Sequence, residues 1–158
     1  MPYTKIKHNK GTTTLTRVED RSQKESIEQT LTSHDDPRPE FITALQAFTA
    51  WAVDVCDLPD DYDEGIRITG VSLSVGEYGG CVVTALKKVS GANAPVVINT
   101  PHVPETPTSD DAPCLPKSVC AMLTTLEEEA DKFWRGERAQ AEMFDTPSQG
   151  VEITEPYT

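Results

Sequence analysis

The side chains best suited to act as bases, nucleophiles or metal ligands, those of histidine and cysteine, are widely spaced in this sequence. His8, His34 and His102 lie far apart, and no serine stands in the G-x-S-x-G context of a hydrolase nucleophile. Cys114 and Cys120 have five residues between them, but no second cysteine pair at zinc-ligand spacing accompanies them. We therefore expect neither a hydrolytic triad nor a metal site, and a protein without enzymatic activity or a cofactor.

Two other patterns resemble ligand-binding loops only in composition. The acidic segment 60–64 lacks the alternating ligands and the glutamate at the twelfth position that a helix-loop-helix calcium site needs, so a solvated loop is the favoured interpretation. Gly76, Gly79 and Gly80 lie between expected strands and do not open a helix, which argues against a phosphate-binding loop.

A possible ligand site lies at the end of an expected strand, where Asn99 and His102 begin a long loop. Loops that follow strands often carry binding residues, and histidine titrates near neutral pH. The alternative, which we favour, is a polar strand exit with turn-forming prolines.

The sharpest signal is the segment Gln140-Ala141-Glu142-Met143-Phe144. It resembles the short peptide by which bacterial replication and repair proteins bind the DNA sliding clamp. Such peptides place a glutamine and two neighbouring hydrophobic side chains in a preformed groove, and Gln140, Met143 and Phe144 match these roles. The resemblance implies a sliding-clamp partner. The alternative is that Phe144 packs back onto the domain as a hydrophobic cap.

The net charge of −12 disfavours nucleic acid as a partner unless basic residues gather on one face. The N-terminal region has the one dense basic cluster, which a solvated basic arm would also explain. A sheet face could add further cations and an aromatic side chain for stacking on single-stranded nucleic acid. The residues of this second hypothesis are Lys5, Lys7, Lys10, Tyr78, Lys87 and Lys88.

The elements that would position these residues follow from hydrophobic periodicity. Residues 39–56 predict a first helix and residues 116–140 a second amphipathic one. Segments 66–75, 81–86 and 95–99 predict an antiparallel meander with a bulge at Gly70, where the alternation changes phase. The expected fold is α+β, an antiparallel three- to four-stranded meander with both helices packed on one face.

Composition divides the chain into three parts. Residues 1–38 are polar and are expected to be a weakly ordered arm with at most an edge strand at 12–18. Residues 39–141 are expected to form a single α+β domain, which includes a proline-rich crossing loop at 99–116. Residues 142–158 are expected to be a flexible acidic tail.

The sequence also indicates a compartment. Cys56, Cys81, Cys114 and Cys120 lie in or beside apolar segments and are expected to be buried free thiols. No apolar window reaches the length of a membrane span, and no secretion signal is apparent. We expect a soluble protein of the cytoplasm, or of the host cytoplasm if a phage encodes it.

The segments FITALQAFTAWAVDVCDLPDDYDEGIRITGVSLS and APVVINTPHVPE, with the ending AQAEMF, resemble a family of small uncharacterised proteins of tailed phages and prophages. The resemblance implies a phage setting and assigns no functional residues. The leading hypothesis is a non-enzymatic interaction protein of a DNA replication or recombination module, tethered to the host clamp. The alternatives are a single-stranded nucleic-acid-binding protein and an acidic inhibitor of a host defence or replication protein.

Overall fold

The chain is built from two sets of three strands, and each set is followed by helix. A computed structural model of the protein describes residues 2–59, 61 and 64–139. The first set is β1 (Tyr3–Asn9), β2 (Thr12–Ser22) and β3 (Glu25–Ser33), followed by α1 (Pro39–Gln46) and α2 (Thr49–Val55). The second set is β4 (Ile66–Leu73), β5 (Cys81–Lys87) and β6 (Val96–Asn99), followed by α3 (Lys117–Trp134).

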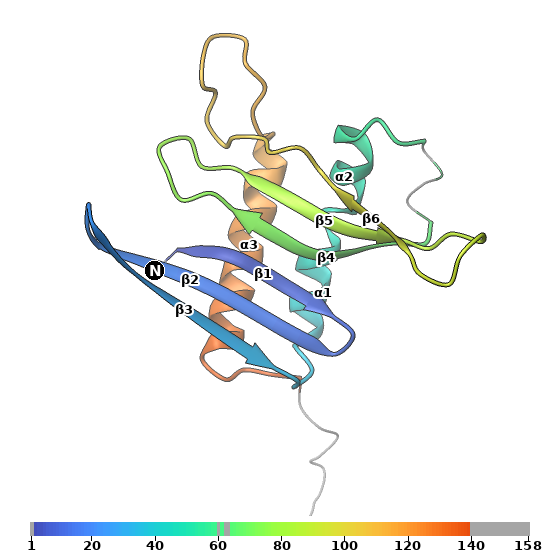
Figure 1. Cartoon of the computed structure of the whole chain (residues 1–158), viewed down its shortest axis with the longest axis horizontal. Helices are drawn as coiled ribbons and strands as arrows, with labels where there is room; N and C mark the ends of the chain where they lie inside the picture. The colour runs from blue at the N-terminus through green and yellow to red at the C-terminus, as the bar shows by residue number, and fades with distance from the viewer. Residues whose placement is uncertain (1, 60, 62–63, 140–158) are drawn as a thin grey trace, which may run out of the picture.

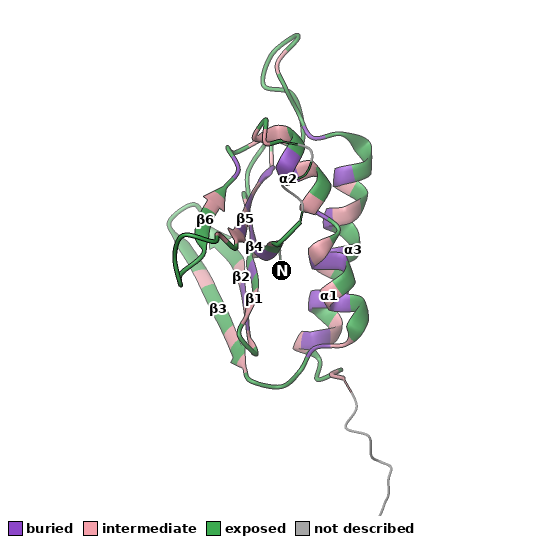
Figure 2. Cartoon of the chain, turned by 90° about the vertical axis from the view of Figure 1, so that its right-hand side faces the viewer, coloured by how far each residue is buried: buried purple, intermediate pink, exposed green. Residues whose placement is uncertain are grey.

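The strands form one antiparallel six-stranded sheet in the order β3-β2-β1-β4-β5-β6. β1 and β4, the first strands of the two sets, pair at its centre, where Ile6 lies opposite Val71. Each set is therefore a meander that extends outward from this central pair. The helices all lie on one face of the sheet, as Figures 1 and 2 show from two directions.

The hydrophobic core fills the space between this face and the helices. A row of side chains crosses the sheet beneath them, from Leu31 through Leu15 and Ile6 to Val71 and Val83. All of these except the partly buried Leu31 are almost completely shielded from solvent. The helices contribute the large buried side chains of Phe41, Leu45, Leu126 and Phe133, and the turn between α1 and α2 contributes Phe48. Removal of this apolar surface from water is the main term that holds the two layers together.

The expectation of a weakly ordered arm over residues 1–38 is wrong, and the sheet has more strands than the three to four expected. These residues form β1, β2 and β3, and the segment 12–18 lies in an interior strand with partners on both sides. The prediction failed because only one face of these strands is buried. Ile6 and Leu15 face the core, while the intervening lysines and threonines make the segment look polar throughout.

The N-terminal strands are also fastened to α3 by polar and ring contacts. The Tyr3 hydroxyl donates a 2.6 Å hydrogen bond to Asp131, and the Arg17 guanidinium lies 3.8 Å from the centre of the Trp134 ring. Burial, reinforced by Asp131, raises the pKa of Tyr3 above its usual range. These contacts hold β1 and β2 against the C-terminal half of α3.

The predicted helices are present but shorter. The first is interrupted between α1 and α2, where the Thr49 hydroxyl bonds the Gln46 carbonyl. The second ends at Trp134 because Gly136, at φ +101°, allows a Schellman closure in which the Glu137 N–H bonds the Lys132 carbonyl.

The predicted hairpin, third strand and bulge of the second set are confirmed. β4 pairs with β5, and β5 pairs with β6. The register of β4 against β5 shifts between Ile68 and Gly70, as the change of phase at Gly70 predicts. Within the described residues, no helix is both long enough and apolar enough to cross a membrane.

Candidate functional site

The face of the sheet opposite the helices is open, and the strand register determines which side chains it carries. Side chains alternate between the two faces of a strand, so the neighbours of the core row point away from the helices. One row on this open face runs across the whole sheet through Thr32, Thr14, Lys7, Gly70, Thr84 and Asn99. A second row runs through Thr30, Thr16, Lys5, Ser72 and Val82. Both rows contain hydroxyls and lysines, with neither a carboxylate nor an aromatic ring.

Lys5 and Lys7 are at the centre of this face, on β1. Both are exposed. The stem of Lys7 crosses Gly70 of β4, where an added Cβ would lie 3.1 Å from the Lys7 Cγ. The absence of a side chain at Gly70 therefore lets Lys7 lie across the neighbouring strand while its ammonium group reaches solvent.

Ion pairs are absent from this face, although the protein as a whole is acidic. Among the described residues, the salt bridges involve Arg38, Lys132, Arg135 and Arg138, which lie in the helical layer or its flanks. None of Lys5, Lys7, Lys10, Arg67 and Lys88 forms one. Cations without a carboxylate partner keep their charge available for an anionic ligand. The two central rows of the open face are thus basic in an otherwise acidic protein.

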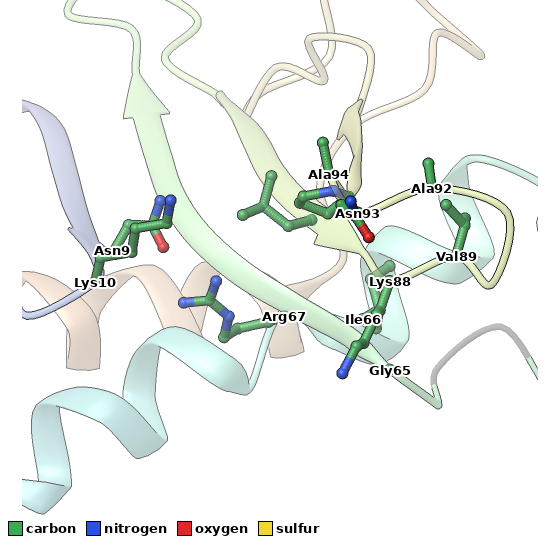
Figure 3. Close-up of a pocket in the computed structure, with 12 residues that line it drawn as sticks. Asn9, Lys10, Gly65, Ile66, Arg67, Lys88, Val89, Ala92, Asn93 and Ala94 are labelled. Carbon is green, nitrogen blue, oxygen red and sulfur yellow. The ribbon is translucent and has the colours of Figure 1, made fainter.

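A pocket of about 570 Å³ adjoins the lysines at one end of the open face. Its walls are the β1–β2 turn, the start of β4 and the β5–β6 connection, and Figure 3 shows Arg67 reaching from β4 toward Asn9 and Lys10. Lys88 adds a further cation, and the lining includes no carboxylate. We use the name basic patch for Lys5, Lys7, Lys10, Arg67 and Lys88, which link the open face to this pocket.

Local backbone geometry places Lys10 at the rim of the pocket. Asn9 pairs with Thr12, so β1 and β2 are joined by the two residues Lys10 and Gly11. Both have positive φ, 52° and 76°, as a tight hairpin turn of the primed type requires. The turn therefore fixes the position of the Lys10 backbone against the sheet.

His8 lies beside the basic patch but on the core side of β1. Its Nδ1 is 2.9 Å from the buried Thr13 hydroxyl. Burial lowers the pKa of His8 below its ordinary value, the Arg67 charge lowers it further, and Asp36 partly opposes the shift. The neutral ring therefore leaves the positive charge near the pocket to Arg67 and the lysines.

The other residues predicted for nucleic-acid binding do not join the patch. Tyr78 lies in the β4–β5 loop, at the opposite end of that hairpin from Lys88, beside a depression that also contains Glu77, Glu105 and Glu127. Lys87 lies on the same face of β5 as the buried Cys81, Val83 and Ala85, and its ammonium group bonds the Glu64 carbonyl. Of the predicted set, the structure gathers Lys5, Lys7, Lys10 and Lys88 and adds Arg67.

Asn99 and His102 have separate partners. The Asn99 side chain accepts a 2.7 Å bond from Thr84 on the open face. The exposed His102 ring approaches the Ser74 hydroxyl at 2.9 Å, beside Gly80. Between them, the buried Thr100 hydroxyl accepts the Val83 N–H. These contacts describe a hydrogen-bonded strand exit, and the two predicted residues do not form a joint ligand site.

The four cysteines form no disulfide, and they are not uniformly buried. Cys81 lies in the core, where burial raises the pKa of its thiol to about 12, whereas Cys114 is exposed. Cys56 and Cys120 are partly buried. Within the part of the chain that the structure describes, no group of three or more histidine, cysteine and acidic side chains could hold a metal ion.

Arg67 is the member of the patch that sequence reasoning missed. Its neighbours Ile66 and Ile68 carry the apolar alternation of β4, so their spacing placed Arg67 on the face away from the core. Identifying Arg67 as a binding residue also required knowing that this face of the sheet is open and that β1 lies beside β4. The predicted clamp-binding residues Gln140, Met143 and Phe144 lie outside the described residues.

Comparisons with known protein families, curated proteins and solved structures find no match to this chain.

Proposed function

We propose that this protein binds single-stranded nucleic acid on the open face of its sheet and has no enzymatic role. The observation that carries the proposal is the placement of Lys5 and Lys7, exposed and without ion pairs, in the middle of a face that no described element covers and whose two central rows contain no carboxylate. In complexes with nucleic acids, lysine ammonium groups most commonly bind the phosphate groups of the backbone.

The chemistry of the face favours contacts with the backbone of a strand over contacts with its bases. The central rows offer ammonium and hydroxyl groups, which donate to phosphate oxygens. They contain no aromatic ring on which a base could stack. We therefore expect little dependence on base sequence.

A single strand fits this surface better than a duplex. The described structure projects no helix from the open face that could enter a groove. The net charge of −12 also repels a duplex, whose charge density is higher than that of a single strand, at long range. A flexible single strand can follow the basic patch and avoid the acidic surface around it.

The test is fluorescence anisotropy with a labelled oligothymidylate at about 50 mM and about 200 mM salt. The double variant Lys5→Gln/Lys7→Gln should bind about tenfold more weakly at low salt, because two phosphate contacts are lost. The slope of log affinity against log salt should fall by about 1.4, or about 0.7 for each phosphate contact.

Lys24→Gln/Lys117→Gln is the matched control, because it removes the same charge from exposed positions in the β2–β3 turn and at the start of α3. If both double variants lost the same affinity, binding would reflect net charge and the open face would not be the site. No binding by the wild type at the lower salt concentration would reject nucleic acid and favour the acidic-inhibitor alternative.

The sliding-clamp tether remains a second proposal, in the setting of a phage replication or recombination module. One structural observation is relevant to it. The residues directly before the motif are attached to the segment between β3 and α1. The Ala139 N–H bonds the Asp36 carbonyl, and Arg138 pairs with Asp35 at 3.5 Å. Gln140 therefore follows an anchored point.

Calorimetry with a bacterial sliding clamp tests this tether. We expect binding by the full chain and its loss in Gln140→Ala/Phe144→Ala, while oligonucleotide binding is unchanged. Ser148→Ala is the control within the same segment. Equal clamp affinity for all three proteins would reject the motif.

A further inference from the structure

We propose that the pocket at the end of the basic patch binds the terminal nucleotide of a strand, with its phosphate monoester between Lys10 and Arg67. This inference rests on the proposed function and specifies which part of the nucleic acid the pocket takes. The pocket volume of about 570 Å³ lies within the range typical of small-molecule sites.

The position of the pocket makes it an end of the binding path. Along β1, Lys5 and Lys7 lead toward Asn9 and Lys10, which line the pocket. On the far side the β5–β6 connection, which includes Asn93 and Pro95, forms a wall (Figure 3). A strand that lies across the two lysines therefore reaches a closed end at the pocket.

The charge in the pocket favours a monoester over an internal phosphate. Lys10, Arg67 and Lys88 come from three separate segments, Arg67 extends toward Lys10 (Figure 3), and the lining residues include no carboxylate. An internal phosphodiester carries one negative charge, whereas a phosphate monoester carries about 1.5 to 2 at neutral pH. The guanidinium of Arg67 can also form two parallel bonds to one phosphate. The additional negative charge of a monoester should therefore increase affinity most at this pocket.

The remaining lining suits the sugar and base of a nucleotide. Leu86 of β5 supplies apolar surface on the open face, and Val89 and Pro95 of the β5–β6 connection add to it. The Asn9 Oδ1 is buried and has no hydrogen-bond partner within the described structure. The Asn9 amide group can donate to a sugar or base oxygen through its Nδ2. Phosphate, sugar and base therefore each have complementary groups in one pocket.

The test compares oligothymidylates that differ only at their ends, using the full-length protein. One strand carries a 5′-phosphate, one a 3′-phosphate and one hydroxyls at both ends, with the fluorescent label placed internally. We expect one phosphorylated strand to bind about tenfold more tightly than the unphosphorylated strand. Arg67→Gln should abolish this preference, so that the phosphorylated and unphosphorylated strands bind this variant with equal affinity.

Arg21→Gln is the matched control, because Arg21 is an exposed arginine at the far end of β2. It should retain the preference, whereas Lys5→Gln/Lys7→Gln should weaken all three strands equally. Equal wild-type affinity for all three strands would overturn the terminal site and leave the proposed function standing. Binding of free thymidine monophosphate without binding of any oligonucleotide would overturn both, and would assign the pocket to a free nucleotide.

Discussion

The two faces of the sheet are made from alternate residues of the same strands, and they are stabilised and used in opposite ways. On the covered face, Ile6 and Leu15 are fully buried under aromatic side chains of the helices. One residue away, Lys5 and Thr14 point to solvent. The covered face contributes most of the apolar burial and therefore most of the stability. The open face contributes little to stability, so its residues can be selected for charge.

This comparison also explains how an acidic protein could bind an anion. Some carboxylates of the helical layer are paired, as Glu129 is between Arg38 and Lys132 at 3.2 Å from each. The sheet stands between that layer and the basic patch. Over distances beyond the Debye length of about 8 Å, salt screens the acidic surface, while a bound phosphate lies within contact distance of the lysines.

The largest expected effect is on the covered face. Phe133→Ala should lower the free energy of unfolding by about 3–5 kcal/mol. The substitution removes a buried ring whose centre lies 5.8 Å from that of Phe41 and leaves a cavity in its place. Denaturant titration measures the loss. Thr124→Ala, at an exposed position of the same helix, should stay within about 0.5 kcal/mol of wild type. Affinity for an oligonucleotide per folded molecule should not change in either variant, and a large change would mean that the two faces are coupled.

A smaller effect should appear on the open face without a loss of stability. Gly70→Ala places a Cβ where the Lys7 stem now lies, and the flexible lysine must move aside. We expect oligonucleotide affinity to fall a few-fold, while the free energy of unfolding changes by less than about 1 kcal/mol. Gly76→Ala is the control, since nothing lies within 4 Å of its added Cβ. Unchanged affinity in Gly70→Ala would show that the position of Lys7 does not matter.

The smallest effect should be a pH dependence at the boundary between the faces. Because burial lowers the pKa of His8 in the folded protein, the unfolded chain takes up a proton first as the pH falls from about 8 toward about 5. His8 therefore contributes stability above its ordinary pKa that is lost as the pH falls through its folded value. His8→Gln should lose less stability than wild type over this range in parallel denaturant titrations. His34→Gln, at an exposed position, should behave as wild type.

Sequence reasoning succeeded best in the second half of the chain. The strands β4, β5 and β6, the bulge at Gly70 and α3 follow from apolar periodicity, because both the core row and the helix stripe are dense there. It failed over residues 1–38, where the threonine-rich strands bury few large side chains. A strand in which Thr13 and Thr16 are buried cannot be recognised from hydrophobicity, since its stability depends on its partners in the sheet.

The candidate site was predicted in part. Lys5, Lys7, Lys10 and Lys88 were identified as cations, but Tyr78 and Lys87 lie elsewhere, and Arg67 was not considered. The reason is that register alone decides the neighbours of a strand residue. A shift of one position would have turned Lys5 and Lys7 toward the helices.

The sequence by itself determined the α+β class, the bulge at Gly70 and the residues of the second meander, because local periodicity carries this information. Only the tertiary structure decided that β1 pairs with β4 and that the helices cover one face. It thereby placed Lys10 of the β1–β2 turn, Arg67 of β4 and Lys88 beyond β5 around one pocket. The physical reason is that strand pairing joins segments far apart in the chain, and the free energy that selects the pairing comes from burying the other face.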